Sequence, residues 1–214
     1  MSVLLIGGCG SIGKRYAAIL KHLNQPFSIC DPKEPTTPDI QAFDRWIIAS
    51  PTDTHIDWCI KAIELKKTFL CEKPISKNLT ECKAIKRMAD DNNVKGALVC
   101  NYKYVLNNNM RYRVHGSANL SYDYFNPGDQ LEWACSQLIY LDPSVSLKSN
   151  SPKWEFRINR PSIDYEILEK SYISMIKDFI DGNYGKLWDL EDGIKLTEAV
   201  LKRLNNGISS KKIS

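Results

Sequence analysis

The sequence has no long apolar run, no sequence repeats and little net charge. None of its windows holds about 18 uninterrupted apolar residues, so it contains no candidate for a membrane-spanning helix. Its 29 basic and 25 acidic side chains leave a formal charge of +4, which is too weak to indicate a nucleic acid or an anionic membrane as partner. The composition, 43% hydrophobic and 25% charged, excludes general disorder, collagen-like repeats and a coiled coil.

Cysteine and histidine are present without the spacing of a disulfide framework or a metal site. The seven cysteines are odd in number and include no C-x-x-C pair. Several of them lie in apolar runs, where a thiol behaves as a small hydrophobe, so we expect a reducing, cytoplasmic location. Three dispersed histidines predict no metal site. The apolar N-terminus lacks the basic region of a secretory signal.

The first 101 residues alternate between strand and helix patterns. We predict strands over 3–6, 27–30, 46–49, 68–71 and 97–100, and helices over 14–23, 54–65 and 78–90. Asn78 is expected to cap the third helix, with Glu81 completing a capping box. This alternation predicts a parallel α/β sheet of the Rossmann type in a first domain, 1–101.

The pattern changes after Asn101. Residues 114–124 and 154–158 alternate between apolar and polar, which predicts an antiparallel sheet. Two helices follow, one over about 165–179 and one over about 189–206, capped by Asp189. We therefore expect a smaller α+β domain over 102–214, whose last helix packs back on the first domain.

The turn after the first strand carries the pattern Gly8-x-Gly10-x-x-Gly13. In a dinucleotide-binding fold these glycines permit a tight turn, the approach of a pyrophosphate, and helix–strand contact. The helix N-terminus at Ser11 and Ile12 then offers unpaired N–H groups to the phosphates. Asp31, which ends the second strand, is expected to accept hydrogen bonds from the adenosine ribose and to favour NAD over NADP, although nearby Lys33 leaves NADP possible. The alternative is an ordinary strand–helix turn without a ligand.

Two further segments follow predicted strands, where open α/β sheets bind their ligands. They are Ala49-Ser50-Pro51-Thr52-Asp53-Thr54-His55 and Cys71-Glu72-Lys73-Pro74. Together with the glycine-rich turn they resemble, in order and spacing, the glucose–fructose oxidoreductase / inositol dehydrogenase family (Gfo/Idh/MocA). The resemblance implies that Ser50, Pro51, Thr52, His55, Glu72 and Lys73 join Gly8, Gly10, Ser11, Ile12, Gly13 and Asp31 at the cofactor. His55 could instead brace the helix that follows it.

The resemblance implies an NAD(P)-dependent oxidoreductase that acts on a hydroxyl-bearing carbon of a sugar, inositol or nucleotide sugar. In the family, the lysine of the Glu-Lys-Pro motif sits between nicotinamide and substrate, and here this lysine is Lys73. Lys103 follows the last Rossmann strand and is a candidate substrate contact. The family also implies a homodimer or higher homo-oligomer formed through the second-domain sheet, here around Trp154, Phe156 and the tyrosines of 122–124.

The sequence departs from the family in two places. Only twelve residues separate Asp31 from Asp44, where the family has a helix and a further strand, so the chain looks like a shortened member. The family's acid/base histidine is replaced by Gln137, a candidate substrate contact, and Tyr140 stands at the motif's last aspartate. Glutamine cannot exchange a proton near neutral pH. Either Lys73 with Tyr102 or Tyr140 transfers the proton, or the substrate needs little acid/base help, or activity has been lost.

Three hypotheses follow from these residues. The leading one is the NAD(P)-dependent oxidoreductase with a sugar-like substrate. A catalytically degenerate NAD(H)-binding regulator or partner subunit would explain Gln137 but not the retained Lys73. A bilin-reductase-like enzyme could work without the histidine, although the Glu-Lys-Pro segment favours the sugar dehydrogenases.

Overall fold

The computed structural model describes residues 2–106, 117–119, 131–141, 146–148, 155–156 and 165–206. The first half of the chain contains β1 (Val3–Ile6), α1 (Ser11–His22), β2 (Phe27–Cys30), η1 (Ile40–Ala42), β3 (Arg45–Ile48), η2 (Thr52–Thr54), α2 (His55–Glu64), β4 (Thr68–Cys71), α3 (Leu79–Asp91), β5 (Gly96–Leu98) and α4 (Asn101–Leu106). The second half contains β6 (Ser117–Asn119), α5 (Leu131–Ala134), α6 (Ser136–Leu141), β7 (Ser146–Lys148), β8 (Glu155–Phe156), α7 (Tyr165–Asp181), η4 (Tyr184–Lys186), β9 (Trp188–Asp189) and α8 (Leu190–Asn205).

The main sheet has the strand order β2-β1-β3-β4-β5-β9. The first five strands are parallel, and β9 joins β5 antiparallel. The predicted parallel α/β sheet is therefore confirmed. Central strands such as β1 are buried along their whole length, because helices cover both faces of the sheet. The two-residue strand β9 was not predicted, since so short a segment has no periodicity to detect.

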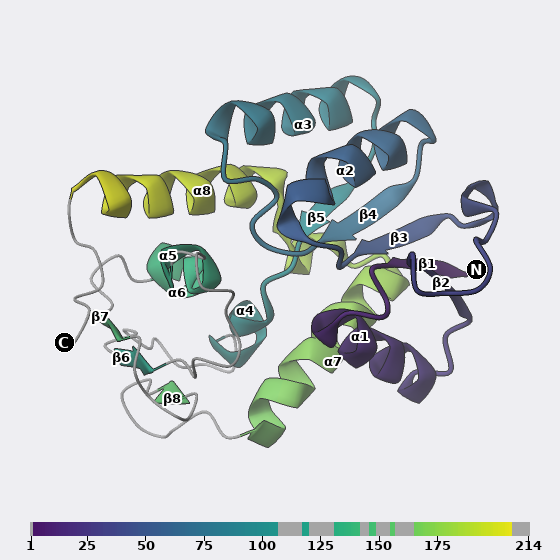
Figure 1. Ribbon diagram of the computed structural model, residues 1–214, viewed down its shortest axis with the longest axis horizontal. Coiled ribbons are helices and arrows are strands. Elements are labelled where there is room, and N and C mark those ends of the chain that lie inside the picture. The colour runs from purple at the N-terminus through teal and green to yellow at the C-terminus, as the bar shows by residue number, and fades with distance from the viewer. Residues whose placement is uncertain are drawn as a thin grey trace.

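Helices cover the main sheet on both faces (Figure 1). The α2 and α3 helices lie on one face, where Cys59, Ile63 and Ile85 belong to a core that continues into α8. The α1 and α7 helices lie on the other face, with a second core around Tyr16, Leu20 and Phe179. The sheet thus forms the middle of a three-layer arrangement, and its strand ends lie between the layers.

The smaller sheet has the order β7-β6-β8 and lies away from the main sheet, on the far side of α4 (Figure 1). The β6–β8 pair is antiparallel as predicted, whereas β6–β7 is parallel, so the sheet is mixed. The predicted strands over 114–124 and 154–158 contain β6 and β8. Their remaining residues, including Tyr122, Tyr124 and Trp154, lie outside the described part of the structure. The division into domains 1–101 and 102–214 stays a prediction.

The C-terminal helices are fixed by polar contacts at their ends. At the start of α8 the Asp189 carboxylate accepts from the Asp192 N–H at 2.9 Å, and Asp192 accepts from the Asp189 N–H at 3.1 Å, a reciprocal capping box. The helix then packs against α3, α6 and β5. The predicted cap of α8 by Asp189 is thereby confirmed.

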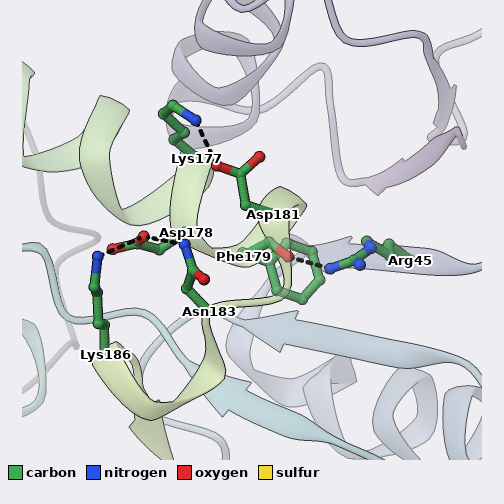
Figure 2. A network of polar contacts seen from close by, with 7 residues as sticks. All are labelled: Arg45, Lys177, Asp178, Phe179, Asp181, Asn183 and Lys186. Carbon is green, nitrogen blue, oxygen red and sulfur yellow. Dashed lines mark hydrogen bonds and ion pairs between the residues drawn. The ribbon is translucent and has the colours of Figure 1, made fainter.

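The end of α7 is joined to the sheet by Arg45, at the first residue of β3 (Figure 2). The Arg45 guanidinium donates to the Phe179 carbonyl and, at 2.5 Å, to the Tyr184 hydroxyl. It also lies over both aromatic rings, 5.8 Å and 5.6 Å from their centroids. At the same end of α7, on the other side of Phe179 from Arg45, Asp178 accepts from Asn183 at 2.9 Å. This cluster closes the end of the sheet opposite the glycine-rich turn.

The expected capping box at α3 was wrong in one respect. The Asn78 side chain does cap the helix, accepting from the Thr80 N–H at 2.9 Å. Glu81, however, accepts from the Ser76 hydroxyl instead of the Asn78 N–H. The Ser76 hydroxyl in turn accepts from that N–H at 2.9 Å. The Ser76 hydroxyl thus bridges the Asn78 N–H and the Glu81 carboxylate, which do not bond directly as a capping box requires.

Candidate functional site

The candidate site lies where the connections of the main sheet diverge. Strand β1 has β2 on one side and β3 on the other, so the chain leaves the carboxyl end of β1 toward one edge of the sheet and that of β3 toward the other. Such a point leaves a crevice outside the strand ends, the usual place for a ligand in an open α/β sheet. The three predicted motifs follow β1, β3 and β4, whose carboxyl ends lie side by side.

The glycine-rich turn after β1 is closed by its own backbone. The Gly10 N–H donates to the Gly7 carbonyl at 3.1 Å, and Gly7 has φ +77. A Cβ at Gly13 would lie 2.1 Å from the Gly7 oxygen, so this position requires glycine. A Cβ at Gly8 would lie 2.6 Å from the side chain of Ile29 on β2. The turn is thus fixed in shape by tight packing against β1 and β2.

Gly10 differs from the other glycines of the motif. It is the N-cap of α1, with φ −71 and ψ 170 and no side-chain cap. Of the atoms in the described residues, only the Gly7 oxygen would lie within 4 Å of a Cβ there, at 3.3 Å. The first intrahelical bond runs from the Lys14 N–H to the Gly10 carbonyl at 2.9 Å, so the N–H groups of Ser11, Ile12 and Gly13 precede it. The sparse surroundings of Gly10 and the row of N–H donors fit a dinucleotide diphosphate.

Asp31 lies just beyond β2, beside this turn. Its carboxylate accepts from the Cys9 N–H at 3.0 Å and from the Lys33 N–H at 3.0 Å. Burial raises the pKa of Asp31, but these hydrogen bonds and the Lys33 charge outweigh it and lower the pKa below its usual value. Each carboxylate oxygen keeps one further acceptor site. The ionised group can therefore still accept from a ribose hydroxyl.

His55 connects the segments after β3 and β4. Its ring nitrogens lie 2.8 Å from the Ser50 carbonyl oxygen and 2.8 Å from the Pro74 carbonyl oxygen. Thr54 adds a hydrogen bond to the Ser50 hydroxyl at 2.7 Å. His55 is 1% exposed and both of its nitrogens face backbone, which favours the bracing role over direct contact with a cofactor. Pro51 and Thr52 lie between these residues, at the start of η2.

Glu72 and Lys73 follow β4 at the same edge. The Glu72 N–H donates to the Ile48 carbonyl at 2.8 Å, which continues the pairing with β3. The buried Glu72 carboxylate accepts from the Tyr16 hydroxyl of α1 and, at 3.1 Å, from the Lys73 N–H. The contacts of Tyr16 and Glu72 thus bring the segments after β1, β3 and β4 together around Lys73.

The Lys73 side chain lies near Cys135, at the junction of α5 and α6. Burial raises the pKa of the Cys135 thiol to about 12, and the nearby Lys73 charge acts in the opposite direction. Gln137, in the first turn of α6, is 3% exposed, and its Oε1 has no hydrogen-bond partner among the described residues. The α5–α6 segment therefore lies near the carboxyl end of β4, which Lys73 follows.

The other candidates have structural partners. Tyr140 donates to the Asp192 carboxylate of α8 at 3.0 Å and packs edge-on against Trp188. Burial, with the Asp192 charge, raises the pKa of Tyr140 to about 12. Tyr102 is 8% exposed, and burial raises its pKa well above the usual range. Lys103 donates to the Leu187 carbonyl at 3.0 Å. These contacts favour packing roles, so proton transfer by Tyr102 or Tyr140 and substrate binding by Lys103 stay predictions.

Tyr16 was missing from the sequence-based set of site residues. Its helical spacing with Ile19 and Leu20 indicated only the buried face of α1. A buried tyrosine needs a partner for its hydroxyl, which is the one signal that could have drawn attention to it. The sequence could not identify Glu72 as that partner, because the two residues are 56 positions apart.

In the described part of the chain, no group of three or more His, Cys, Asp or Glu side chains is placed to hold a metal ion. Over the same residues, no helix combines the length and apolar character needed to cross a membrane.

Comparison with known proteins gives one family and many structures of the same fold. Residues 31–100 match the oxidoreductase family with an NAD-binding Rossmann fold, Gfo/Idh/MocA. Glucose-6-phosphate 3-dehydrogenase of Bacillus subtilis (strain 168) is 33% identical over 66 residues, which are 31% of this chain and 19% of that protein. The chain thus spans about a fifth of the length of this curated relative.

Two solved structures illustrate the fold. The WlbA (WbpB) dehydrogenase from Thermus thermophilus, in complex with NAD and UDP-GlcNAcA, has a TM-score of 0.70 at 13% identity, over 100% of this chain and 97% of that one. A myo-inositol dehydrogenase from Corynebacterium glutamicum ATCC 13032 has a TM-score of 0.71 at 15% identity, over 96% of each chain. At these identities the likeness establishes the fold alone.

Proposed function

We propose that this chain, whose residues 31–100 match the Gfo/Idh/MocA oxidoreductase family with its NAD-binding Rossmann fold, belongs to that family and is an NAD-dependent oxidoreductase. The proposed substrate is a sugar, inositol or nucleotide sugar, oxidised or reduced at a hydroxyl-bearing carbon. The observation that carries the proposal is the N-terminus of α1 at Gly10, which follows β1, together with Lys73, which follows β4 at the same end of the parallel sheet.

The cofactor would be held by the turn and the adjoining strand end. The N–H groups of Ser11 and Ile12 would bind the diphosphate, with Gly10 leaving room for it. Asp31 would accept from the adenosine ribose, and its negative charge would disfavour the 2′-phosphate of NADP. The exposed Lys33, next to it, could partly offset that repulsion. We therefore propose NAD as the preferred cofactor and NADP as a weaker one.

Lys73 would handle the proton of the substrate hydroxyl. When bound, NAD supplies the acceptor for the hydride that leaves the alcohol carbon. The hydroxyl proton would pass to the Lys73 amine as the carbonyl forms, and would return from Lys73 in the reverse direction. The relatives named above act, by their names, on glucose 6-phosphate and inositol, which supports a polyhydroxylated substrate.

The first experiment is a binding and turnover panel. Thermal unfolding is followed with NAD, NADH, NADP and NADPH, because a ligand at a hundred times its dissociation constant stabilises the folded state by ~2.7 kcal/mol. Sugars, inositols and nucleotide sugars are then screened for absorbance change at the nicotinamide band. Stabilisation by NADH together with turnover supports the proposal. Absence of any stabilisation by the four dinucleotides contradicts it.

A second candidate function is favoured by Gln137. The resemblance aligns Gln137 with the family's acid/base histidine, and the Gln137 side chain is buried. A chain that binds NAD(H) without turnover, as a regulator or partner subunit, would need no proton-transferring group there. Firm NADH binding without turnover on any substrate in the panel would favour this candidate.

A further inference from the structure

Tyr16 and Glu72 form a buried contact between two parts of the candidate site. Tyr16 is 0% exposed and Glu72 is 8% exposed. The Tyr16 hydroxyl donates to Oε1 of Glu72, and the Lys73 N–H donates to Oε2 at 3.1 Å. One carboxylate is thereby shared between helix α1 and the backbone of Lys73.

Both ends of this contact are anchored. Tyr16 lies six residues beyond Gly10 on α1, so a rigid helical rise of ~9 Å connects it to the proposed diphosphate site. Its ring packs 6.1 Å from that of Tyr172 on α7. Glu72 is fixed by the bond from its N–H to the Ile48 carbonyl at 2.8 Å. A displacement of α1 would therefore act on the Glu72 side chain and, through it, on Lys73.

A buried carboxylate is costly unless it is hydrogen-bonded. Packing alone would be served as well by an apolar residue at this position, since replacing a buried charged contact by apolar groups is often neutral or stabilising. Oε2 is directed at the backbone of Lys73, the residue to which the proposed reaction assigns the proton. The carboxylate thus holds the Lys73 N–H by a hydrogen bond, which an apolar residue at position 72 could not do.

We propose that Tyr16 is a positioning residue, which through Glu72 fixes the backbone of Lys73 relative to the dinucleotide-binding helix. This inference rests on the proposed function for the role of Lys73, but the contact itself can be tested without turnover. Binding of NADH at the start of α1 should reduce the motion of the Tyr16 and Glu72 side chains. The hydrogen bond from the Lys73 N–H to Glu72 should then open less often.

The direct test is hydrogen exchange of the Lys73 amide, with and without NADH. Peptides that cover residues 72–75 suit this measurement, because Pro74 has no exchangeable amide. The variants are Tyr16→Phe, which removes only the hydroxyl, and Glu72→Gln, which removes the charge. Tyr184→Phe is the control, since it removes a hydroxyl that accepts from Arg45 at the opposite end of the sheet.

In the parent, NADH should slow exchange at Lys73. In Tyr16→Phe and Glu72→Gln, exchange at Lys73 without cofactor should be about 5- to 10-fold faster, as expected for the loss of one hydrogen bond. If the protein turns over, Tyr16→Phe should lower kcat by a similar factor and leave KM for NAD nearly unchanged. The double variant should lose no more than the worse single variant, because both act through one contact.

Exchange at Lys73 that is unchanged in Tyr16→Phe and Glu72→Gln would overturn the proposal. An equal acceleration in Tyr184→Phe would also overturn it, because a general loss of stability would then explain the effect. A parent that does not bind NADH would contradict the proposed function and leave the cofactor-free comparison decisive for the contact. A loss of thermal stability without faster exchange of the Lys73 amide would show that Tyr16 only stabilises the fold.

Discussion

At the scale of single residues, the glycines of the turn have different tasks. Gly13 is required by packing, because a Cβ there would lie 2.1 Å from the Gly7 oxygen and 2.7 Å from the Gly8 Cα. Gly10 has backbone angles that any residue can adopt, and a Cβ there would meet one atom, at 3.3 Å. The sequence motif does not distinguish them. Packing therefore explains Gly13 fully, whereas at Gly10 it leaves room for the diphosphate contact that we propose.

Asp31 gives a prediction about cofactor choice. Asp31→Ala should weaken NADH binding and narrow the preference for NADH over NADPH, because it removes both the ribose acceptor and the charge that repels a 2′-phosphate. Fluorescence titration with both cofactors measures this preference. An unchanged ratio of the two dissociation constants would remove Asp31 from the ribose contact.

The same variant tests the charge state of Asp31. Its pKa is lowered in the folded protein by the Lys33 and Cys9 N–H groups, despite the opposing effect of burial. The carboxylate should therefore stabilise the fold fully above its usual pKa of 3.8 and lose this effect as the pH falls through the lower folded value. The difference in Tm between parent and Asp31→Ala should be complete at pH 6 and shrink only below about pH 4.

Lys73 gives the prediction for catalysis. Lys73→Met keeps the bulk of the side chain and removes the amine, so turnover should fall by roughly 10²–10⁴-fold, as for a lost acid/base. NADH binding should change little, since the turn and Asp31 would carry most of it. Gln137→His introduces the histidine that the resemblance implies at this position, and we expect it to raise turnover. Turnover that survives Lys73→Met would defeat the lysine assignment.

At the scale of elements, the strands were predicted best. The expected strands over 3–6, 27–30 and 68–71 coincide with β1, β2 and β4, because short apolar runs between turn residues leave little freedom in their limits. The motifs directly after these strands could therefore be placed at the carboxyl end of the sheet. The detour of Glu81 to Ser76, the two-residue β9 and the contact of Tyr16 with Glu72 could not be predicted, since each depends on side-chain geometry or on residues far apart in sequence.

The attachment of α7 to the sheet gives a prediction at this scale. Arg45→Met keeps an unbranched side chain but removes the bonds to the Phe179 carbonyl and the Tyr184 hydroxyl (Figure 2). We expect a loss of about 2 kcal/mol in the free energy of unfolding, because hydrogen bonds from a charged group are worth ~1.5–3 kcal/mol.

The matched control for Arg45 is Lys177→Met. Lys177 pairs with Asp181 on the exposed side of α7 (Figure 2), and such i,i+4 pairs contribute only about 0.3–0.5 kcal/mol. Urea unfolding of parent and both variants measures the difference. Equal losses in the two variants would contradict a specific role for Arg45.

At the scale of the whole molecule, we predict self-association through the second-domain sheet. The sequence places Trp154 and Phe156 in one alternating segment, of which β8 is the described part. We expect the apolar positions of this segment to form a face that another subunit covers, because apolar patches that a chain leaves uncovered commonly mark interfaces. Sedimentation velocity at micromolar concentration should show a dimer or a larger species. A single species at the chain mass of 24.4 kDa would contradict this prediction.

The central claim is that a dinucleotide binds across Gly10 at the start of α1. Its most direct test is NADH titration, followed by nicotinamide fluorescence, of the parent, of Gly10→Val, and of Gly185→Val as a control at a glycine with nothing within 4 Å of an added Cβ. We predict that Gly10→Val remains folded and binds NADH more than about tenfold more weakly, a loss above ~1.4 kcal/mol, while Gly185→Val binds as the parent does. Parent-like NADH affinity in a folded Gly10→Val would contradict the account.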